Sequence, residues 1–195
     1  MGRFLLGILV GLVAAPVLVL CWLVWGNPPV AVADRPLPFE SRIAGSAQHA
    51  RIDRSMIKTP PIQPTEDNLI AGAQIYNDQC AVCHGLRGKA SAIAPHMFPH
   101  VPQLWQAHRN GTMVGVSDDP PGETYWKVAN GIRLSGMPAF DHILTNEQMW
   151  QVSLLLANAN KPLPPAATVM VSAPPEPGNP PAAAPAPATP AGKQM

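Results

Sequence analysis

The stretch Cys80-Ala81-Val82-Cys83-His84 is the most informative part of this chain. Two cysteines three positions apart lie on nearly the same face of one helical turn, so both thiols can bond to a single flat ligand. A histidine directly after the second cysteine is placed to bind a metal at the centre of that ligand. The C-x-x-C-H pattern is typical of covalent haem attachment, with two thioether bonds from Cys80 and Cys83 and an iron bond from His84.

Two other interpretations of this motif are weaker. A C-x-x-C pair can be a redox dithiol, but a dithiol does not need an adjacent histidine. The pair can also be half of a zinc site, but a site with four ligands needs a second pair. The chain has 3 cysteines, and the remaining one, Cys21, lies in an apolar run. The sequence therefore predicts one haem c, with its iron, bound covalently.

The N-terminal segment 1–26 is predicted to be a transmembrane anchor. Phe4–Trp25 contains no charged residue, and a helix of this length spans roughly 33 Å, enough to cross a bilayer core. Arg3 precedes the run and the next basic residue is Arg35, which leaves the N-terminus in the cytoplasm. The alternative is a cleaved signal peptide, because Ala31-Val32-Ala33 resembles a cleavage site, although the apolar run is longer than usual.

Haem c is attached outside the bacterial cytoplasm, so the haem-binding part of the chain must be exported. An uncleaved N-terminal helix would then hold it at the inner membrane. We therefore expect a single-pass protein with its haem domain on the periplasmic side.

Composition divides the rest of the chain into three parts. Residues 27–64 are rich in proline and are interpreted as a spacer, with a short helix near 46–56. Residues 162–195 are rich in Pro and Ala, which predicts a disordered tail. The segment between them, 65–161, is the one expected to fold as a domain. The formal net charge is +1, so nothing indicates a nucleic-acid partner.

Helix signals in this domain predict an all-α fold, and no alternating strand pattern is present. N-cap residues or first-turn prolines mark several helix starts, and glycine or proline marks their ends. The expected helices run from Thr65 to Cys83, around 103–110, from 120 to 130, and from the capping box Thr145-Asn146-Glu147-Gln148 to about 161.

An electron-transfer haem usually has a second axial ligand, which is methionine or histidine. Met137 lies in a stretch with glycine before it and proline after it. The glycine allows the backbone to approach the ring, and the proline stiffens the loop. We predict Met137 as this ligand; the alternative is a packing methionine beside a five-coordinate or bis-histidine iron. The other candidates are His96, His100, Met97 and Met113.

Several stretches together resemble a class I monohaem cytochrome c, and the resemblance covers roughly 66–158. They are Gly72-Ala73-Gln74-Ile75-Tyr76, Cys80–Gly85 and GIRLSGMPAF at 131–140. Gly122-Glu123-Thr124-Tyr125-Trp126 is similar to the G-E-x-[FY]-W of membrane-anchored periplasmic members. The resemblance implies the class I cytochrome c fold, in which the first helix, at Gly72 and Tyr76, crosses the last helix near Trp150 and Leu154.

The resemblance also implies roles for residues around the haem. The carbonyl of a loop proline should accept the ring N–H of His84. Pro95 is the candidate by distance along the chain, and Pro102 is the candidate by its P-x-L context. Trp126 and Arg133 should donate hydrogen bonds near the haem propionates, although core packing is an equal interpretation for Trp126.

The function implied is electron transfer by an iron that cycles between ferrous and ferric, without catalysis by this chain itself. The expected partners are a quinol-oxidising complex, a periplasmic dehydrogenase or a terminal oxidase. The spacer and the tail would let the domain swing between them. The alternatives are a haem subunit of a dehydrogenase or oxidase complex, a haem peroxidase, and a haem-based sensor with a labile distal ligand.

Overall fold

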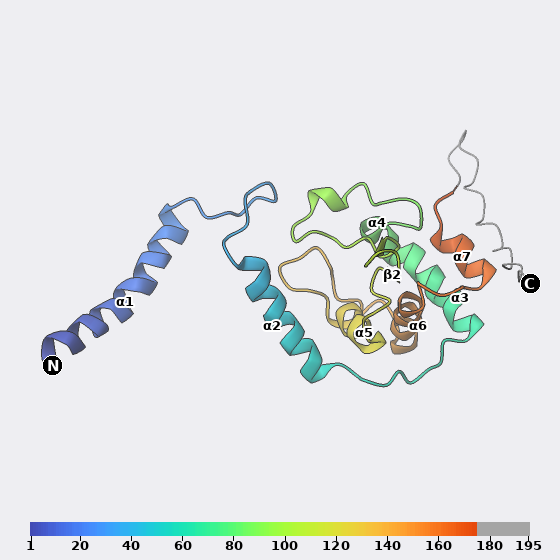
Figure 1. Cartoon of the computed structure of the whole chain (residues 1–195), viewed down its shortest axis with the longest axis horizontal. Coiled ribbons are helices and arrows are strands. Elements are labelled where there is room, and N and C mark those ends of the chain that lie inside the picture. Colours follow the sequence, from blue (N-terminus) through green and yellow to red (C-terminus); the bar gives the residue numbers. More distant parts are fainter. Residues whose placement is uncertain (175–195) are drawn as a thin grey trace, which may run out of the picture.

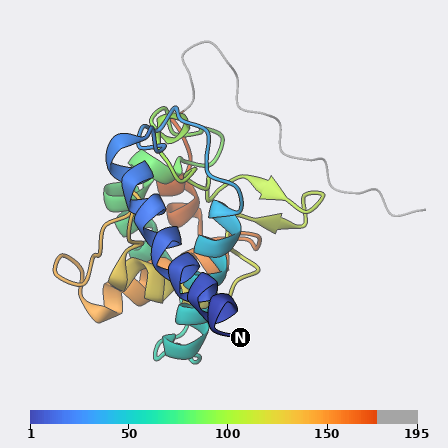
Figure 2. The ribbon, with the colours of Figure 1, turned by 90° about the vertical axis from the view of Figure 1, so that its left-hand side faces the viewer.

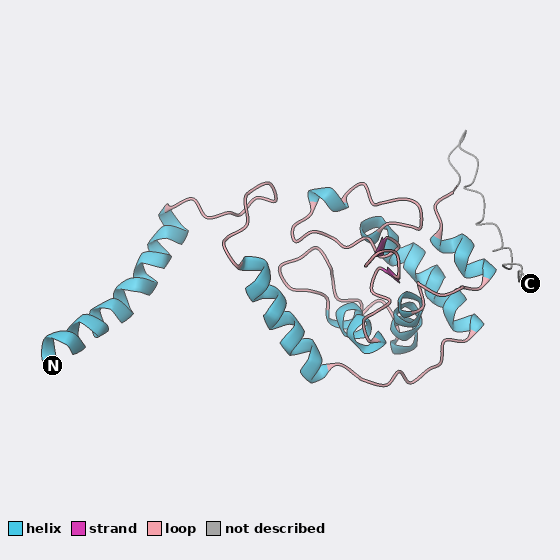
Figure 3. Cartoon of the chain, in the orientation of Figure 1, coloured by secondary structure: helices cyan, strands magenta, loops and turns pink. Residues whose placement is uncertain are grey.

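The structure is a computed structural model that describes residues 1–174. Helices make up most of its regular structure, and one long helix stands apart from the rest (Figures 1 and 3). The α-helices are α1 (Gly2–Trp25), α2 (Glu40–Ser55), α3 (Glu66–Ile75), α4 (Ala81–His84), α5 (Pro121–Asn130), α6 (Asn146–Ala157) and α7 (Pro165–Val171). A π-helical turn (Tyr76–Cys80), a 3₁₀ turn (Ala94–His96) and the strands β1 (Ala107–His108) and β2 (Met113–Val114) complete the described structure.

Helix α1 agrees with the expected membrane-spanning segment. It is the one helix within residues 1–174 that is long and apolar enough to cross a membrane. None of its residues is buried against the rest of the chain, and Figure 1 shows it projecting away from the other helices. Its apolar side chains therefore lack a protein environment, and this suggests a membrane anchor.

The core forms where α3 crosses α6, and glycine permits the close approach. A Cβ atom added to Gly72 would collide with the carbonyl oxygen of Gln151 and lie 3.2 Å from the Cβ of Leu155. The two helices therefore pack backbone to backbone. Both predicted N-caps are confirmed: Thr65 caps α3, and Thr145 forms a capping box with Gln148 on α6.

Two aromatic contacts extend this core. The Tyr76 hydroxyl donates a 2.6 Å hydrogen bond to the carbonyl of Gly85, and its ring meets Trp105 edge to face at 5.5 Å. On the other side of the core, Tyr125 of α5 stacks on Trp150 of α6 at 4.2 Å. Burial raises the pKa of Tyr76, which keeps its hydroxyl neutral and able to donate.

The helix expected around 103–110 is not present, and a small hairpin takes its place. Strand β1 pairs antiparallel with β2, so that Ala107 faces Val114, and Figure 2 shows the pair projecting from the helices. The turn between them has positive φ at Arg109, Asn110 and Gly111. An Asn-Gly pair favours such a turn over a helix, and the all-α class is otherwise confirmed.

The structure also extends beyond the expected limits of the domain. Helix α2 is longer than the helix expected near 46–56, and it packs against α5 rather than remaining a free spacer. The boundary placed at residue 161 is corrected as well, because α7 packs against α3 with Ala167 and Val171 fully buried. Prolines at the start of α7 are compatible with a helix there, since first-turn N–H groups have no helical partner. Residues 175–195 of the expected tail lie outside the described part of the chain.

We predict that Gly72→Ala lowers the free energy of unfolding by about 1–3 kcal/mol, because the added methyl group forces α3 and α6 apart. Gly45→Ala is the matched control, since a Cβ at Gly45 in α2 meets no atom within 4 Å. That variant should be unchanged or more stable by up to about 1 kcal/mol. Denaturant unfolding of the holoprotein measures both, and equal stabilities would contradict the close crossing.

Candidate haem site

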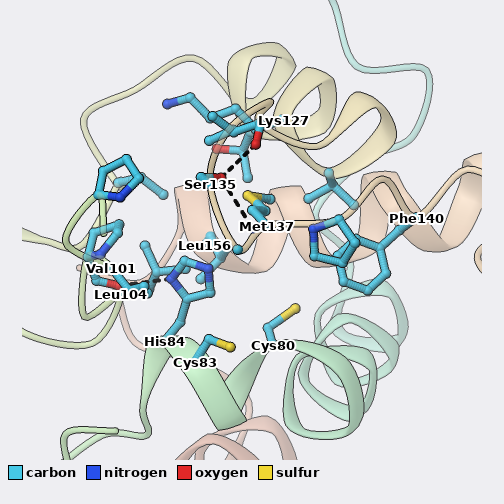
Figure 4. Close-up of a pocket in the computed structure, with 18 of the residues that line it drawn as sticks. Cys80, Cys83, His84, Val101, Leu104, Lys127, Ser135, Met137, Phe140 and Leu156 are labelled. Carbon is cyan, nitrogen blue, oxygen red and sulfur yellow. Dashed lines mark hydrogen bonds between the residues drawn. The ribbon is translucent and has the colours of Figure 1, made fainter. Parts of the chain in front are cut away.

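The first wall of the candidate site is built by the end of α3 and by α4. The π-helical turn Tyr76–Cys80 connects the two helices, with the Ala81 N–H donating to the Tyr76 carbonyl. Such wide turns often occur at functional sites. Cys80, Cys83 and His84 all line a cavity of about 330 Å³, and Figure 4 shows them together on one side of it.

His84 is oriented by a hydrogen bond to the chain that returns beneath α4. Its Nδ1 lies 2.8 Å from the carbonyl oxygen of Pro102, which can only accept, so Nδ1 carries the proton and Nε2 keeps its lone pair. Burial lowers the pKa of His84, with the Pro102 bond opposing this effect, so the imidazole is held in the neutral form that binds metals. Of the two candidate prolines, the structure places Pro102 beside His84. Pro95 is exposed in the 3₁₀ turn and does not line the cavity.

Gln103, for which the sequence predicts no role, explains why Pro102 occupies this position. Its side-chain amide donates to the carbonyl of Cys83 at 3.2 Å and accepts from the N–H of Ser91 at 2.7 Å. The N–H of Leu104 also donates to the carbonyl of His84 at 3.2 Å. These bonds tie 102–104 to the end of α4. One indication of this role is present in the sequence, because Gln103 is the middle residue of the P-x-L stretch.

The second wall comes from the loop after α5. Met137 lines the cavity, and Figure 4 shows it entering from the side opposite the cysteines. The Ser135 hydroxyl accepts from the N–H of Met137 at 3.2 Å and donates to the carbonyl of Ile132 at 2.6 Å. Gly131 has φ 65°, and a Cβ there would lie 2.7 Å from the N of Ala139. The loop is therefore tightly folded and holds Met137 in place.

The structure separates the other candidates for the distal ligand. Met97 and His100 also line the cavity, whereas His96 and Met113 do not. Met97 packs against Gly136, since a Cβ added to this glycine would collide with its terminal methyl group. Met97 therefore supports the loop that carries Met137.

The two expected propionate donors are not brought to the cavity. Trp126 is half-buried on α5 and Arg133 is exposed, and neither lines the cavity. The helical period explains this for α5, because Thr124, Lys127 and Val128 share the face that lines the cavity and Trp126 lies off it. The polar side chains that do line the cavity are Gln48, Gln79, His100, Thr124, Lys127 and Ser135.

The composition of the cavity fits a haem. Apart from these polar groups its lining is mainly apolar, as a flat macrocycle requires, and the two thiols and the imidazole lie on one wall. The apolar side chains are Val101, Leu104, Val116, Val128, Ile132, Phe140, Val152 and Leu156. Within residues 1–174, no group of three or more His, Cys, Asp and Glu residues is placed to hold a bare metal ion.

The environment of Cys80 differs from that of a reactive redox thiol. Burial, followed by the charge of Cys83, raises the pKa of Cys80 to about 12. A reactive redox dithiol has a lowered thiol pKa instead. The environment of Cys80 is therefore that of an apolar pocket wall.

A known protein family matches most of this domain. Residues 67–154 match the family model described as "Cytochrome C oxidase, cbb3-type, subunit III". A search among curated proteins finds no match. Among solved structures, a chain of the Kuenenia stuttgartiensis reducing HAO-like protein complex Kustc0457/Kustc0458 is similar, with 22% identity and a TM-score of 0.42. That comparison covers 55% of this chain and 50% of that one, so it spans half the length of the neighbour.

The family match, rather than the structural likeness, carries the assignment. The matched region begins in α3 and ends in α6, so it spans both walls of the cavity. It also contains Cys80, Cys83, His84 and Met137. Residues 67–154 therefore form a cytochrome c domain, of the family that binds haem c and its iron covalently.

Proposed function

We propose that this protein carries single electrons through one covalently bound haem whose axial ligands are His84 and Met137. The observation that carries this proposal is the position of Met137, on the wall opposite the cysteines and His84. His84 and Met137 would together hold the iron and leave no position open for a substrate. The haem would supply a ferrous–ferric couple, and the role of the chain would be to bind and shield it.

The residues of the pocket influence the reduction potential of this couple and the rigidity of its ligands. A methionine ligand and an apolar environment both favour a higher reduction potential than a histidine ligand or an exposed haem. The Pro102 carbonyl fixes the orientation of His84, and Ser135 fixes the loop of Met137. Because the Pro102 carbonyl holds the His84 ring and the Ser135 hydroxyl holds the backbone of Met137, little rearrangement should accompany electron transfer.

The edge that exchanges electrons is proposed to be the one beside the cysteines. Val82, Ile93 and Phe98 are exposed apolar residues of the surrounding segments, and the Ser91 hydroxyl links the first two through the Val82 carbonyl and the Ile93 N–H. Leu134, on the Met137 loop, is 91% exposed with φ 60°. A leucine is rarely found in that conformation and rarely so exposed. Exposed apolar residues such as Val82, Ile93 and Phe98 suit docking of a redox protein at the edge beside the cysteines, and Leu134 offers a further apolar contact on the Met137 loop.

The proposed partner is a quinol-oxidising complex, a periplasmic dehydrogenase or a terminal oxidase. The matching family is named for a subunit of a cytochrome c oxidase, which favours the terminal oxidase among the three. Helix α1 would anchor the chain in the inner membrane, with the haem domain on the periplasmic side. The domain would then meet partners that lie in or on the same membrane.

We predict that Met137→Ala leaves the haem attached but opens its sixth coordination position. The ferric spectrum should lose its weak sulfur-to-iron band at the red end and become high-spin. Met113→Ala is the matched control, because Met113 lies in β2, does not line the cavity and should leave the band in place. Absorption spectroscopy of both holoproteins measures the effect. A band that survives in Met137→Ala would show that the distal ligand is misassigned.

We also predict that the double variant Cys80→Ala, Cys83→Ala loses covalent haem, because both thioether bonds require these sulfurs. Cys21→Ala, which removes the third cysteine in α1, should keep haem that resists acid–acetone extraction. The measurement is haem staining after denaturing electrophoresis of protein from a host that matures c-type haems. Staining of the double variant would refute the attachment.

A further inference from the structure

Helix α2 lies outside the matched region, yet it packs against α5. Ile52 is 0% exposed, and it is the one buried residue of an otherwise polar helix. Beyond the helix, the carbonyl of Ile57 lies so close to Gly122 that any side chain there would collide with it. A fully buried isoleucine stabilises the docked position of its helix through the hydrophobic effect. Ile52 of α2, Ile57 just after it and Gly122 of α5 therefore favour the docked position.

A group of charged residues on α5 faces the same helix. Glu123 is nearly buried, and its Oε1 lies 4.0 Å from Nδ1 of His49 on α2. Nζ of Lys127 lies 2.6 Å from the same oxygen, as an ion pair rather than a well-aligned hydrogen bond, and 3.8 Å from Asp119. His49 of α2 therefore lies beside the Glu123–Lys127 ion pair of α5.

The docking of α2 brings one of its residues to the haem cavity. Gln48 lines this cavity together with Thr124 and Lys127 of α5. It lies one helical turn before Ile52, so the two side chains share a face of α2. The burial of Ile52, which anchors the helix, therefore also holds Gln48 at the cavity.

We propose that α2 is a wall of the haem pocket, in which Gln48 faces the haem and the Ile52 contact holds it there. This proposal rests on the proposed function only in taking the haem to occupy this cavity. Its first consequence concerns the reduction potential. A haem edge covered by α2 is shielded from water, and burial is one of the factors that set the potential of a haem.

The second consequence concerns the tether between the membrane and the haem. If α2 belongs to the domain, the movable segment is not 27–64 but the stretch between Trp25 and Glu40. Fully extended, this stretch reaches at most about 50 Å. The proposed partner is therefore one whose docking face lies within that distance of the membrane.

Ile52→Asp tests the docking in the full-length holoprotein, since an unpaired carboxylate cannot remain buried at this contact. We expect amide hydrogen exchange in α2 to become at least about tenfold faster and the reduction potential to fall, while the sulfur-to-iron band remains. Ile43→Asp is the control, because Ile43 lies on the same helix and is 66% exposed. It should leave both the exchange and the potential unchanged.

Gln48→Glu tests the second part of the proposal without disturbing the docking. A carboxylate that faces the haem favours the ferric iron, so the potential should fall while exchange in α2 stays slow. Gln63→Glu introduces the same charge at an exposed position outside the cavity and should shift the potential much less. If Ile52→Asp does not fold, Gln48→Glu still tests whether α2 is a wall of the haem pocket.

Two results would overturn the proposal. Equal exchange in Ile52→Asp and Ile43→Asp would show that α2 is not docked. Equal potentials in Gln48→Glu and Gln63→Glu would show that α2 is not a wall of the pocket. Failure of the proposed function is distinguishable from both, since it would remove the sulfur-to-iron band from the unmodified protein.

Discussion

The hydrogen bond between Nδ1 of His84 and the carbonyl of Pro102 connects the haem motif to the rest of the domain. A histidine at the end of a four-residue helix has no fixed orientation of its own, and the bond gives it one. Gln103 and Leu104 hold the carbonyl in place through their own bonds to Cys83 and His84. The first wall of the pocket therefore depends on two segments, and neither alone would direct Nε2 into the cavity.

Helix α5 lines the haem cavity on one face and packs against α2 on another. Thr124 and Lys127 line the haem cavity, Glu123 lies beside His49 of α2, and Tyr125 stacks on Trp150 of the core. These roles account for most of the Gly-Glu-Thr-Tyr-Trp stretch in physical terms. Gly122 allows the backbone of Ile57, just after α2, to approach, and the buried glutamate lies between Lys127 and His49. A change in this helix would therefore affect the pocket and its cover together.

The sequence predicted what depends on neighbouring residues and missed what depends on distant ones. The caps at Thr65 and Thr145 follow local rules that hold wherever the helix lies, and the structure confirms them. The choice between Pro95 and Pro102 depends on the side-chain bonds of Gln103, which spacing alone does not reveal. Likewise, the docking of α2 depends on the single buried residue Ile52, which leaves no amphipathic pattern in an otherwise polar helix.

The extra contacts of α2 and α7 change how a tethered electron carrier would work. A long flexible spacer searches a large volume at low effective concentration, whereas a short one searches less volume at a higher concentration. The stretch between Trp25 and Glu40 contains Pro28, Pro29, Pro36 and Pro38, and proline makes a linker extended and semi-rigid. With α2 docked as we propose, the domain would be held at a limited range of heights above the membrane. Such an arrangement favours repeated contact with one membrane complex over diffusion between several.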